Sequence, residues 1–394
     1  MFKGDQCLDE ISILILTLNY NTMKIIRLFS AIIIAAFFNS CANEDFQPQT
    51  TAPLGKYNSG AFVLNEGSFG SSNASVSFIS SDLNTFESSV FDAVNPSTIL
   101  GDAAQSICLN GDLAYIVLNG SNKIQIVNRY TMKKVGEITS GLNNPRYMVI
   151  ANGQAFVTNW GETSNTATVP DPTLDDFVAV INLTSNTVSS TISVVEGPER
   201  IVANSNTLYV SHKGGFGFGS SVSVINSTTK AIITTIATGD LPSTMQISGG
   251  FLWLLCEGKP SYAPSETGGK LQKISLSTNA ITDTFSFSLN TDHPSNLDLY
   301  NNRLYYTIDK GIYRMSLTPV ASIALPTAPI FSTSLQNVYG FAVNSDRIYV
   351  SGFNSFSNPG KIEVFAAGES NDPPVGTLLK SQTVGFFPNG FYFN

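Results

Sequence analysis

The chain has 394 residues, a formal net charge of −8 at pH 7 and a pI near 4.8, and only 13% of its residues are charged. Nucleic-acid binding needs a basic face, so this acidic balance argues against a nucleic-acid partner. The low charge and the abundance of Ser, Thr, Asn and Gly favour β-strands joined by turns over helices.

A signal-like pattern begins at Met23, where two basic residues precede an apolar run and Cys41 follows. Residues 1–22 lack this order because three acidic residues precede their apolar run. We therefore expect residues 1–22 to be an upstream extension and residues 23–40 to be a signal peptide. The cysteine that follows favours a lipoprotein signal peptide. A plain signal peptide or a short membrane anchor is the alternative, although the apolar run is short for a transmembrane helix.

The residues around Cys41 resemble the lipidation site of bacterial lipoproteins, with Ser40 before the cysteine that would be cleaved and lipidated. Residues 41–59 are polar and contain proline, which is typical of a flexible tether. The pair Glu44–Asp45 resembles the surface-export signal of lipoproteins in the Bacteroidetes phylum. This resemblance implies a lipid-anchored protein of the outer membrane, exposed at the cell surface and touching the membrane only through its anchor.

An internal repeat occupies the rest of the chain. Each unit has a lead residue, an apolar run, a polar turn and a second apolar run with an aromatic near its middle. Eleven residues separate the lead residue from the aromatic, as in Pro198 to Tyr209 and Pro294 to Tyr305. The average interval of about 48 residues is typical of propeller blades. The seven aromatics are Phe62, Tyr115, Phe156, Tyr209, Trp253, Tyr305 and Tyr349.

The two ends of the repeat predict how the ring closes. Phe62 has no lead residue upstream, whereas residues 387–394 form a lead run with no partner after it. We predict an all-β fold, a seven-bladed β-propeller over residues 60–394 that is closed by N- and C-terminal strands in one blade. Closure of this kind covers the open sheet edges, and the unbroken repeat leaves no room for a second domain.

Loop lengths predict where ligands bind. If the strands of a blade are numbered from the centre outward, the one–two and three–four connections are short. The two–three connections are long and unequal, and they begin near residues 161, 214, 258 and 352. In antiparallel order they emerge on the face that also carries the lead residues, which we name the loop face. Binding residues concentrate on loops held by a rigid scaffold, so we expect the site there.

Register places a ring of mixed donors, acceptors and aromatics around the centre of the loop face. Such a ring suits a large polar ligand with an apolar body. The candidate ligand-binding residues are Asn65, Glu66, Gln105, Arg146, Tyr147, Asn159, Trp160, Arg200, His212, Lys213, Glu257, Asn296, Tyr339 and Phe353.

Several of these residues have a structural alternative. Arg146 and Arg200 could pair with carboxylates of a neighbouring blade, Trp160 could cap the core between blades, and His212 could be solvated. The seven repeat aromatics are expected in the core rather than in the site.

Signals for catalysis are weak. The sequence lacks a nucleophile elbow, a His-Glu-x-x-His helix, a Gly-rich phosphate loop and an EF-hand loop. Two histidines cannot build a three-histidine metal site, and Cys108 and Cys256 fall in different blades as small buried residues. We expect a non-enzymatic protein with no catalytic residues, no cofactor and no metal. An enzyme that relies on carboxylates is the least favoured alternative.

The stretches "PERIVANSNTLYVSHK…SVSVINSTT" and "PRYMVIANGQAFVTNW…FVAVINLTS" resemble the YncE-like seven-bladed propellers. Together with Cys41 and the acidic pair, the chain is similar to the surface propeller lipoproteins of Bacteroidetes. One branch of these, the BtuG-type proteins, captures corrinoids and passes them to a TonB-dependent outer-membrane transporter. The resemblance implies a cobamide or another large polar small molecule as ligand and such a receptor as partner. A surface platform for protein–protein interaction or adhesion is the alternative.

Overall fold

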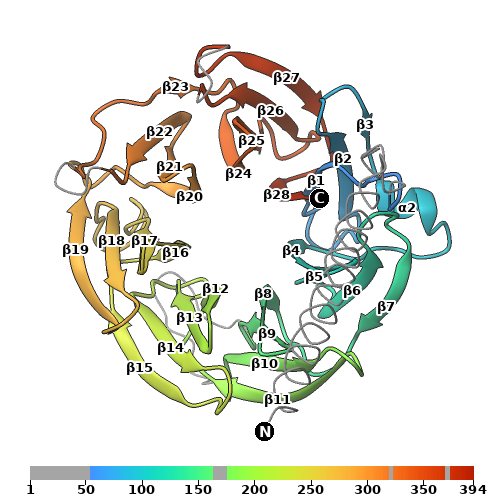
Figure 1. The fold of residues 1–394 in the computed structure, drawn as a ribbon, viewed down its shortest axis with the longest axis horizontal. Helices are drawn as coiled ribbons and strands as arrows, with labels where there is room; N and C mark the ends of the chain where they lie inside the picture. Colours follow the sequence, from blue (N-terminus) through green and yellow to red (C-terminus); the bar gives the residue numbers. More distant parts are fainter. Residues whose placement is uncertain (1–53, 163–174, 319–322, 369–372) are drawn as a thin grey trace, which may run out of the picture. The chain divides into compact units, whose positions relative to one another are not determined.

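A computed structural model describes residues 54–162, 175–318, 323–368 and 373–394 (Figure 1). The predicted extension 1–22, the signal peptide 23–40, Cys41 and most of the tether lie outside these ranges. No helix in the described part of the chain has the length and apolar character needed to cross a membrane.

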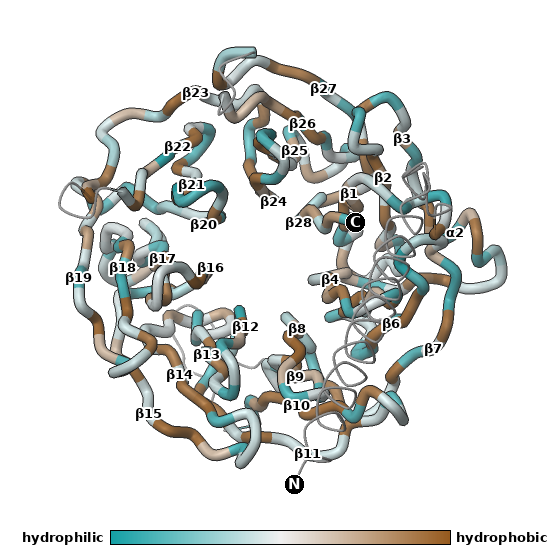
Figure 2. The backbone as a smooth tube through the Cα atoms, viewed as in Figure 1, coloured by the Kyte–Doolittle hydropathy of each residue, from teal (hydrophilic) through white to brown (hydrophobic). Residues whose placement is uncertain are grey.

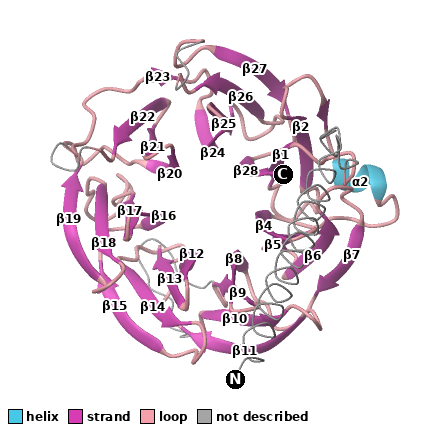
Figure 3. Ribbon diagram, viewed as in Figure 1, coloured by secondary structure: helices cyan, strands magenta, loops and turns pink. Residues whose placement is uncertain are grey.

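Seven four-stranded antiparallel sheets surround a central axis, which confirms the predicted seven-bladed propeller (Figures 1 and 3). Blade 1 comprises, from the axis outward, β28 (Pro388–Phe393), β1 (Gly60–Asn65), β2 (Ser75–Ser80) and β3 (Phe86–Glu87). Blade 2 comprises β4 (Ala104–Asn110), β5 (Leu113–Leu118), β6 (Lys123–Asn128) and β7 (Lys134–Ile138). Blade 3 comprises β8 (Pro145–Ala151), β9 (Gln154–Asn159), β10 (Phe177–Asn182) and β11 (Thr187–Ser193).

The remaining four blades follow in the same order. Blade 4 comprises β12 (Pro198–Asn204), β13 (Thr207–His212), β14 (Ser221–Asn226) and β15 (Ile232–Ala237). Blade 5 comprises β16 (Pro242–Ser248), β17 (Phe251–Cys256), β18 (Lys270–Ser275) and β19 (Ala280–Ser286). Blade 6 comprises β20 (Ser295–Tyr300), β21 (Arg303–Ile308), β22 (Gly311–Ser316) and β23 (Phe331–Ser332). Blade 7 comprises β24 (Asn337–Asn344), β25 (Arg347–Phe353), β26 (Lys361–Ala366) and β27 (Leu378–Thr383).

Blade 1 joins the two ends of the ring, as predicted. The C-terminal strand β28 pairs with β1 in antiparallel register, with Ala61 opposite Phe393. Side chains fasten the seam. Arg129 Nε donates to Asn394 Oδ1 at 2.6 Å, and Asn394 Nδ2 donates to the carbonyl of Tyr57 at 2.6 Å. No edge of β1 is left open, because β2 covers its other side.

The hydrophobic core is divided into seven clusters, one between each pair of neighbouring blades. Each cluster contains one repeat aromatic, and all seven of these rings are buried, which confirms their predicted core role. Figure 2 shows the hydrophobic residues within the blades and hydrophilic residues at many of the turns. The blades are therefore held by lateral packing of sheet on sheet rather than by a single central core.

Every innermost strand carries a β-bulge directly after its lead residue. The register shifts between Pro145 and Met148 in β8, for example, and between Pro198 and Ile201 in β12. The other five innermost strands shift at the equivalent place. A bulge bends the strand and re-aims its side chains, so the residues just after each lead residue turn toward the axis.

Two features depart from the prediction. A short helix, α2 (Val90–Val94), links blades 1 and 2 and buries Val90 and Phe91 in the first cluster (Figure 3). The expectation that all three–four connections are short is wrong for blades 6 and 7, where residues 317–330 and 367–377 intervene. In blade 6 the outer strand pairs over only two residues, and apolar side chains of the long connection pack against the core in its place.

The closing strand should contribute strongly to stability. Phe391 is buried, and its ring centroid lies 5.5 Å from that of Tyr349 in blade 7. We expect Phe391→Ala to lower the free energy of unfolding by about 3–5 kcal/mol, because the cavity it leaves lies at the seam. Leu378→Ala in β27 is the matched control, since Leu378 is 52% exposed. Urea unfolding measures both variants, and equal losses in the two would contradict the role of the seam.

Candidate functional site

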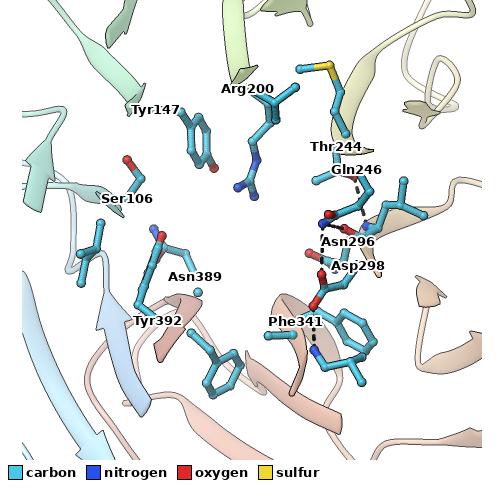
Figure 4. A pocket seen from close by; sticks show the side chains of 18 of the residues that line it. Ser106, Tyr147, Arg200, Thr244, Gln246, Asn296, Asp298, Phe341, Asn389 and Tyr392 are labelled. Carbon is cyan, nitrogen blue, oxygen red and sulfur yellow. Dashed lines mark hydrogen bonds between the residues drawn. The ribbon is translucent and has the colours of Figure 1, made fainter. Parts of the chain in front are cut away.

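Two cavities follow one another along the propeller axis. The mouth cavity, of about 260 Å³, opens at the loop face, and the channel cavity, of about 430 Å³, lies deeper. Figure 4 shows the side chains that line the channel cavity. The two share a set of lining residues, so they meet end to end. The shared residues are Tyr147, Arg200, Thr244, Asn296 and Asn389.

The bulges decide which side chains reach each cavity. The first residue after a lead residue, such as Arg146 or Glu199, lines the mouth cavity. The second residue, such as Tyr147 or Arg200, lies between the two cavities. The fourth, such as Asp298, lines the channel cavity, because alternate residues of a strand share one face. The backbone of the bulge is held by a hydroxyl of the second strand, as where Tyr147 N donates to Thr158 Oγ1 at 3.0 Å.

Two ion pairs cross between blades at the mouth. Arg146 Nη2 and Nε donate to the two oxygens of Glu199 at 2.9 and 3.0 Å, and Lys213 Nζ lies 2.8 Å from Glu257 Oε2. Burial pushes the pKa of Glu199 upward, but the Arg146 guanidinium outweighs it and holds the pKa below its usual value. The structural alternative for Arg146 is therefore realised, since the guanidinium is committed to a carboxylate of the next blade.

Aromatic and carboxyl groups complete the mouth. The Arg146 guanidinium lies 4.0 Å from the ring centre of Trp160, whose Nε1 donates to the carbonyl of Pro198 at 3.1 Å. Tyr339 Oη donates to Glu66 Oε2 at 2.5 Å across the seam between blades 7 and 1. Burial raises the pKa of Glu66, although this hydrogen bond opposes the rise. Trp160, Glu66 and Tyr339 thus border the mouth with their polar atoms already engaged.

Arg200 differs from the cations at the mouth. Its guanidinium lies 3.9 Å from the ring centre of Tyr147 and points into the channel (Figure 4). Across the described ranges, no side chain or carbonyl accepts a hydrogen bond from it. Tyr147 Oη accepts from Gln105 Nε2 at 2.9 Å, which fixes the ring beneath the cation.

Asp298 is the carboxylate of the channel. It accepts hydrogen bonds from Val343 N at 2.7 Å, Leu299 N at 2.8 Å and Gln246 Nε2 at 3.0 Å. Burial raises the pKa of Asp298 to about 6, and the two backbone donors and the Arg200 charge oppose the rise only in part. The channel therefore holds one cation and one carboxyl group that do not form an ion pair within 4.0 Å.

The structure brings together most of the predicted site residues. Those that line the mouth cavity are Gln105, Arg146, Tyr147, Arg200, Lys213, Glu257, Asn296 and Tyr339, and Glu66 and Trp160 contact members of this set. In Asn296, which lines both cavities, the side-chain Nδ2 donates to Thr307 Oγ1 at 3.1 Å.

His212, Asn65 and Asn159 are corrections. Each is the last residue of a second strand, and all three are at most 1% exposed. The His212 imidazole lies 2.8 Å from Ser223 Oγ inside blade 4, and burial lowers its pKa to about 4. Strand alternation turns this position into the sheet and the following residue, such as Lys213 or Trp160, toward the mouth. These three residues therefore tie loops and strands together instead of facing a ligand.

Phe353 also departs from its expected place. It is 7% exposed and packs among other rings, with centroid distances of 5.8 Å to Tyr339, 5.1 Å to Phe356 and 5.0 Å to Phe387. It supports the mouth from below rather than lining it.

Sequence reasoning missed the deeper channel residues Ser106, Gln246, Asp298 and Tyr392. The available signal was alternation. Thr244 and Gln246, like Asn296 and Asp298, stand two residues apart on an innermost strand and therefore share the face that lines the axis. The predicted residues come from the start of the first strand and the end of the second strand of each blade, so the deeper positions of the first strand were left out.

Four exposed aromatic side chains lie on separate two–three loops of the loop face, and we name them the rim aromatics. They are Phe69 at 79% exposure, Phe216 at 57%, Tyr262 at 74% and Phe356 at 76%. The Phe216 ring makes an edge contact with Trp160 at a centroid distance of 5.8 Å. The loop face therefore carries exposed rings on four of its loops as well as the polar mouth.

Chemically, the arrangement favours binding through hydrogen bonds, charge and ring contacts. Within the described ranges, no group of three or more His, Cys, Asp or Glu side chains is placed to hold a metal ion. Burial raises the pKa of both described thiols, Cys108 and Cys256, to about 12, so neither is a ready nucleophile.

The Arg146–Glu199 pair yields a prediction for stability. Arg146→Met should lower the free energy of unfolding by about 3–5 kcal/mol, because it leaves a buried carboxylate unpaired. The double variant Arg146→Met with Glu199→Gln removes that charge and should recover at least half of the loss. Chemical denaturation at pH 7 measures both. A single variant as stable as the parent protein would contradict a buried pair.

The sign of the pH effect follows from the depressed pKa of Glu199. The stability that the pair contributes should be complete above the ordinary Glu pKa and should be lost as the pH falls through the lower, folded-state value. The Arg146→Met variant should lack this dependence.

Comparisons with known structures agree on the fold. A functionally unknown protein from Desulfotomaculum acetoxidans superposes with a TM-score of 0.60 and 11% identity, covering 85% of this chain and 98% of that one. A putative 6-phosphogluconolactonase from Bacteroides fragilis superposes with a TM-score of 0.59 and 11% identity, covering 85% of this chain and 98% of that one. A putative 6-phosphogluconolactonase from Bacteroides uniformis has a TM-score of 0.56 and 12% identity, covering 85% of this chain and 99% of that one. At these identities the likeness concerns the fold alone.

No curated protein matches the chain significantly. A family model matches residues 59–394, which span the whole propeller. The chain therefore belongs to the family described as "Domain of unknown function (DUF5074)".

Proposed function

We propose that the protein is a non-enzymatic cell-surface lipoprotein that captures a large polar ligand with an apolar body on its loop face. The observation that carries this proposal is the set of rim aromatics, four exposed rings on four different loops of the face where the polar mouth opens. A cobamide is the ligand we name first, and a TonB-dependent outer-membrane transporter is the partner that would receive it.

The rim and the mouth would have different roles in binding. Exposed rings supply flat apolar contact area at a low cost in conformational entropy. The mouth cavity of about 260 Å³ is too small for the body of a cobamide, so the macrocycle would lie across the rim. Its amide side groups would reach the ion-paired residues below, where charged donors and acceptors such as Lys213 and Glu257 are available.

The same rim would also suit a protein partner, because exposed apolar patches framed by polar groups mark interaction surfaces. This alternative, a surface interaction or adhesion platform, uses the rim aromatics but needs neither cavity. A ligand-binding measurement separates the two.

Binding should depend on the rim. Isothermal titration calorimetry of the purified protein with cyanocobalamin should show saturable binding. The double variant Tyr262→Ala with Phe356→Ala should weaken it at least tenfold, because both rings lose their contacts. Ile233→Ala is the matched control, since Ile233 is 52% exposed on the outer strand of blade 4, away from the mouth. Absence of heat with corrinoids would exclude this ligand and favour the platform.

Membrane attachment should depend on Cys41, which lies outside the described residues. We expect Cys41→Ser to abolish incorporation of a labelled fatty acid and to move the protein from the outer-membrane fraction to the soluble one. Cys7→Ser is the matched control and should change neither, since Cys7 precedes the proposed signal peptide. Lipidation that persists in the Cys41 variant would contradict the proposed anchor.

A further inference from the structure

The channel cavity contains a cation, Arg200, whose guanidinium has no hydrogen-bond acceptor within the described ranges. Four titratable residues line this cavity. Arg200 is the cation, and the other three are Tyr147, Asp298 and Tyr392. Figure 4 shows its guanidinium directed into the cavity. A guanidinium has five N–H donors, and none of them has an acceptor within the described ranges.

Other arginine and lysine groups nearby are committed. Arg146 is held by two bonds to Glu199, and Lys213 pairs with Glu257. Arg129 donates to Asn394 and to the carbonyl of Phe393 at the seam. Arg200 is also held in position, since its guanidinium lies over the Tyr147 ring and Gln105 fixes that ring. Its guanidinium N–H groups, however, have no acceptor within the described ranges.

The geometry around Arg200 fits an anionic group. Stacking on Tyr147 covers one face of the guanidinium and leaves its edges open, where the N–H groups form a fork that matches a carboxylate or a phosphate. Tyr147 Oη accepts from Gln105, so its own hydrogen is available for donation. These donors converge where the mouth and channel cavities meet.

A neutral amide lines the place where the two cavities meet. Asn389 lines both cavities, and its Nδ2 donates to the carbonyl of Ala104 at 2.8 Å, which fixes the orientation of the amide. The residue at this position is uncharged, so it does not repel an anion held by Arg200.

We propose that the channel cavity binds a small organic anion, whose carboxylate or phosphate headgroup is held by Arg200 and Tyr147. The cavity of about 430 Å³ has room for a metabolite of modest size. This site is separate from the rim and does not depend on the identity of the ligand bound there.

The test uses inorganic phosphate and succinate as separate probes in calorimetry at low ionic strength. At least one should bind, and the stronger of the two identifies the headgroup. Arg200→Gln should weaken binding at least tenfold. Lys133→Gln is the matched control, because it removes the same charge from an exposed position between β6 and β7 that lines neither cavity, and it should change binding less than threefold. Failure of both probes, or equal losses in the two variants, would overturn the proposal.

Two conservative variants separate a loss of binding from a loss of folding. Arg200→Lys keeps the charge but removes the fork, so it should bind more weakly than the parent and more tightly than Arg200→Gln. Asn389→Asp would place a carboxylate beside the anion and should also weaken binding. Unchanged binding in both would overturn the assignment of these residues.

The affinity should also depend on pH. Sulfate is a suitable probe because it does not titrate between pH 5 and 8, and arginine and tyrosine ordinarily keep their charge there. Burial raises the pKa of Asp298 to about 6, so its negative charge should be lost as the pH falls through that value and sulfate should bind more tightly. Asp283→Asn should preserve this dependence, because Asp283 is exposed on the outer strand β19 and lines neither cavity. An affinity that is flat from pH 5 to 8 would argue against a site beside Asp298.

Discussion

One backbone irregularity, repeated seven times, determines what faces the axis of this propeller. Each innermost strand shifts its register directly after the lead residue, and a hydroxyl of the second strand holds the displaced backbone in blades such as 3 and 4. Without the shift, the side chains after the lead residue would alternate regularly between the core and the axis. With it, consecutive residues such as Arg146 and Tyr147 both reach the cavities. The scaffold therefore supplies two polar rings, one at the mouth and one below it.

The two rings differ in how their charges are balanced. At the mouth, cations of one blade are matched with carboxylates of the next, which joins the blades as it fills the opening. In the channel, Arg200 and Asp298 are held apart by different supports, a ring under the guanidinium and backbone amides around the carboxylate. Matched charges suit rigidity, whereas separated charges suit recognition of a ligand with its own donors and acceptors.

Much of this could be predicted from the sequence, because the fold depends on spacing. The eleven-residue interval fixed seven blades, the buried aromatics and the shared closing blade. The loop face and most of the mouth residues followed from counting along the strands. The wrong site residues are those for which the spacing along a strand did not determine the direction of the side chain. His212 and Lys213 are neighbours, yet one points into the sheet and the other toward the mouth. The pairing of Arg146 and the freedom of Arg200 depend on contacts between blades that no spacing contains.

The shared blade has a consequence for how the binding site comes into being. Asn389 and Tyr392, which line the channel, belong to the last strand of the chain, and that strand must find a partner made near the start. During synthesis six blades can assemble while the ring is still open, and the channel wall stays incomplete until the final residues emerge. A ribosome that stops early would therefore release a protein that is largely structured but has no finished pocket. Ligand binding would therefore require the complete chain. In a truncated product, the gap between the first and last blades would be open to proteases.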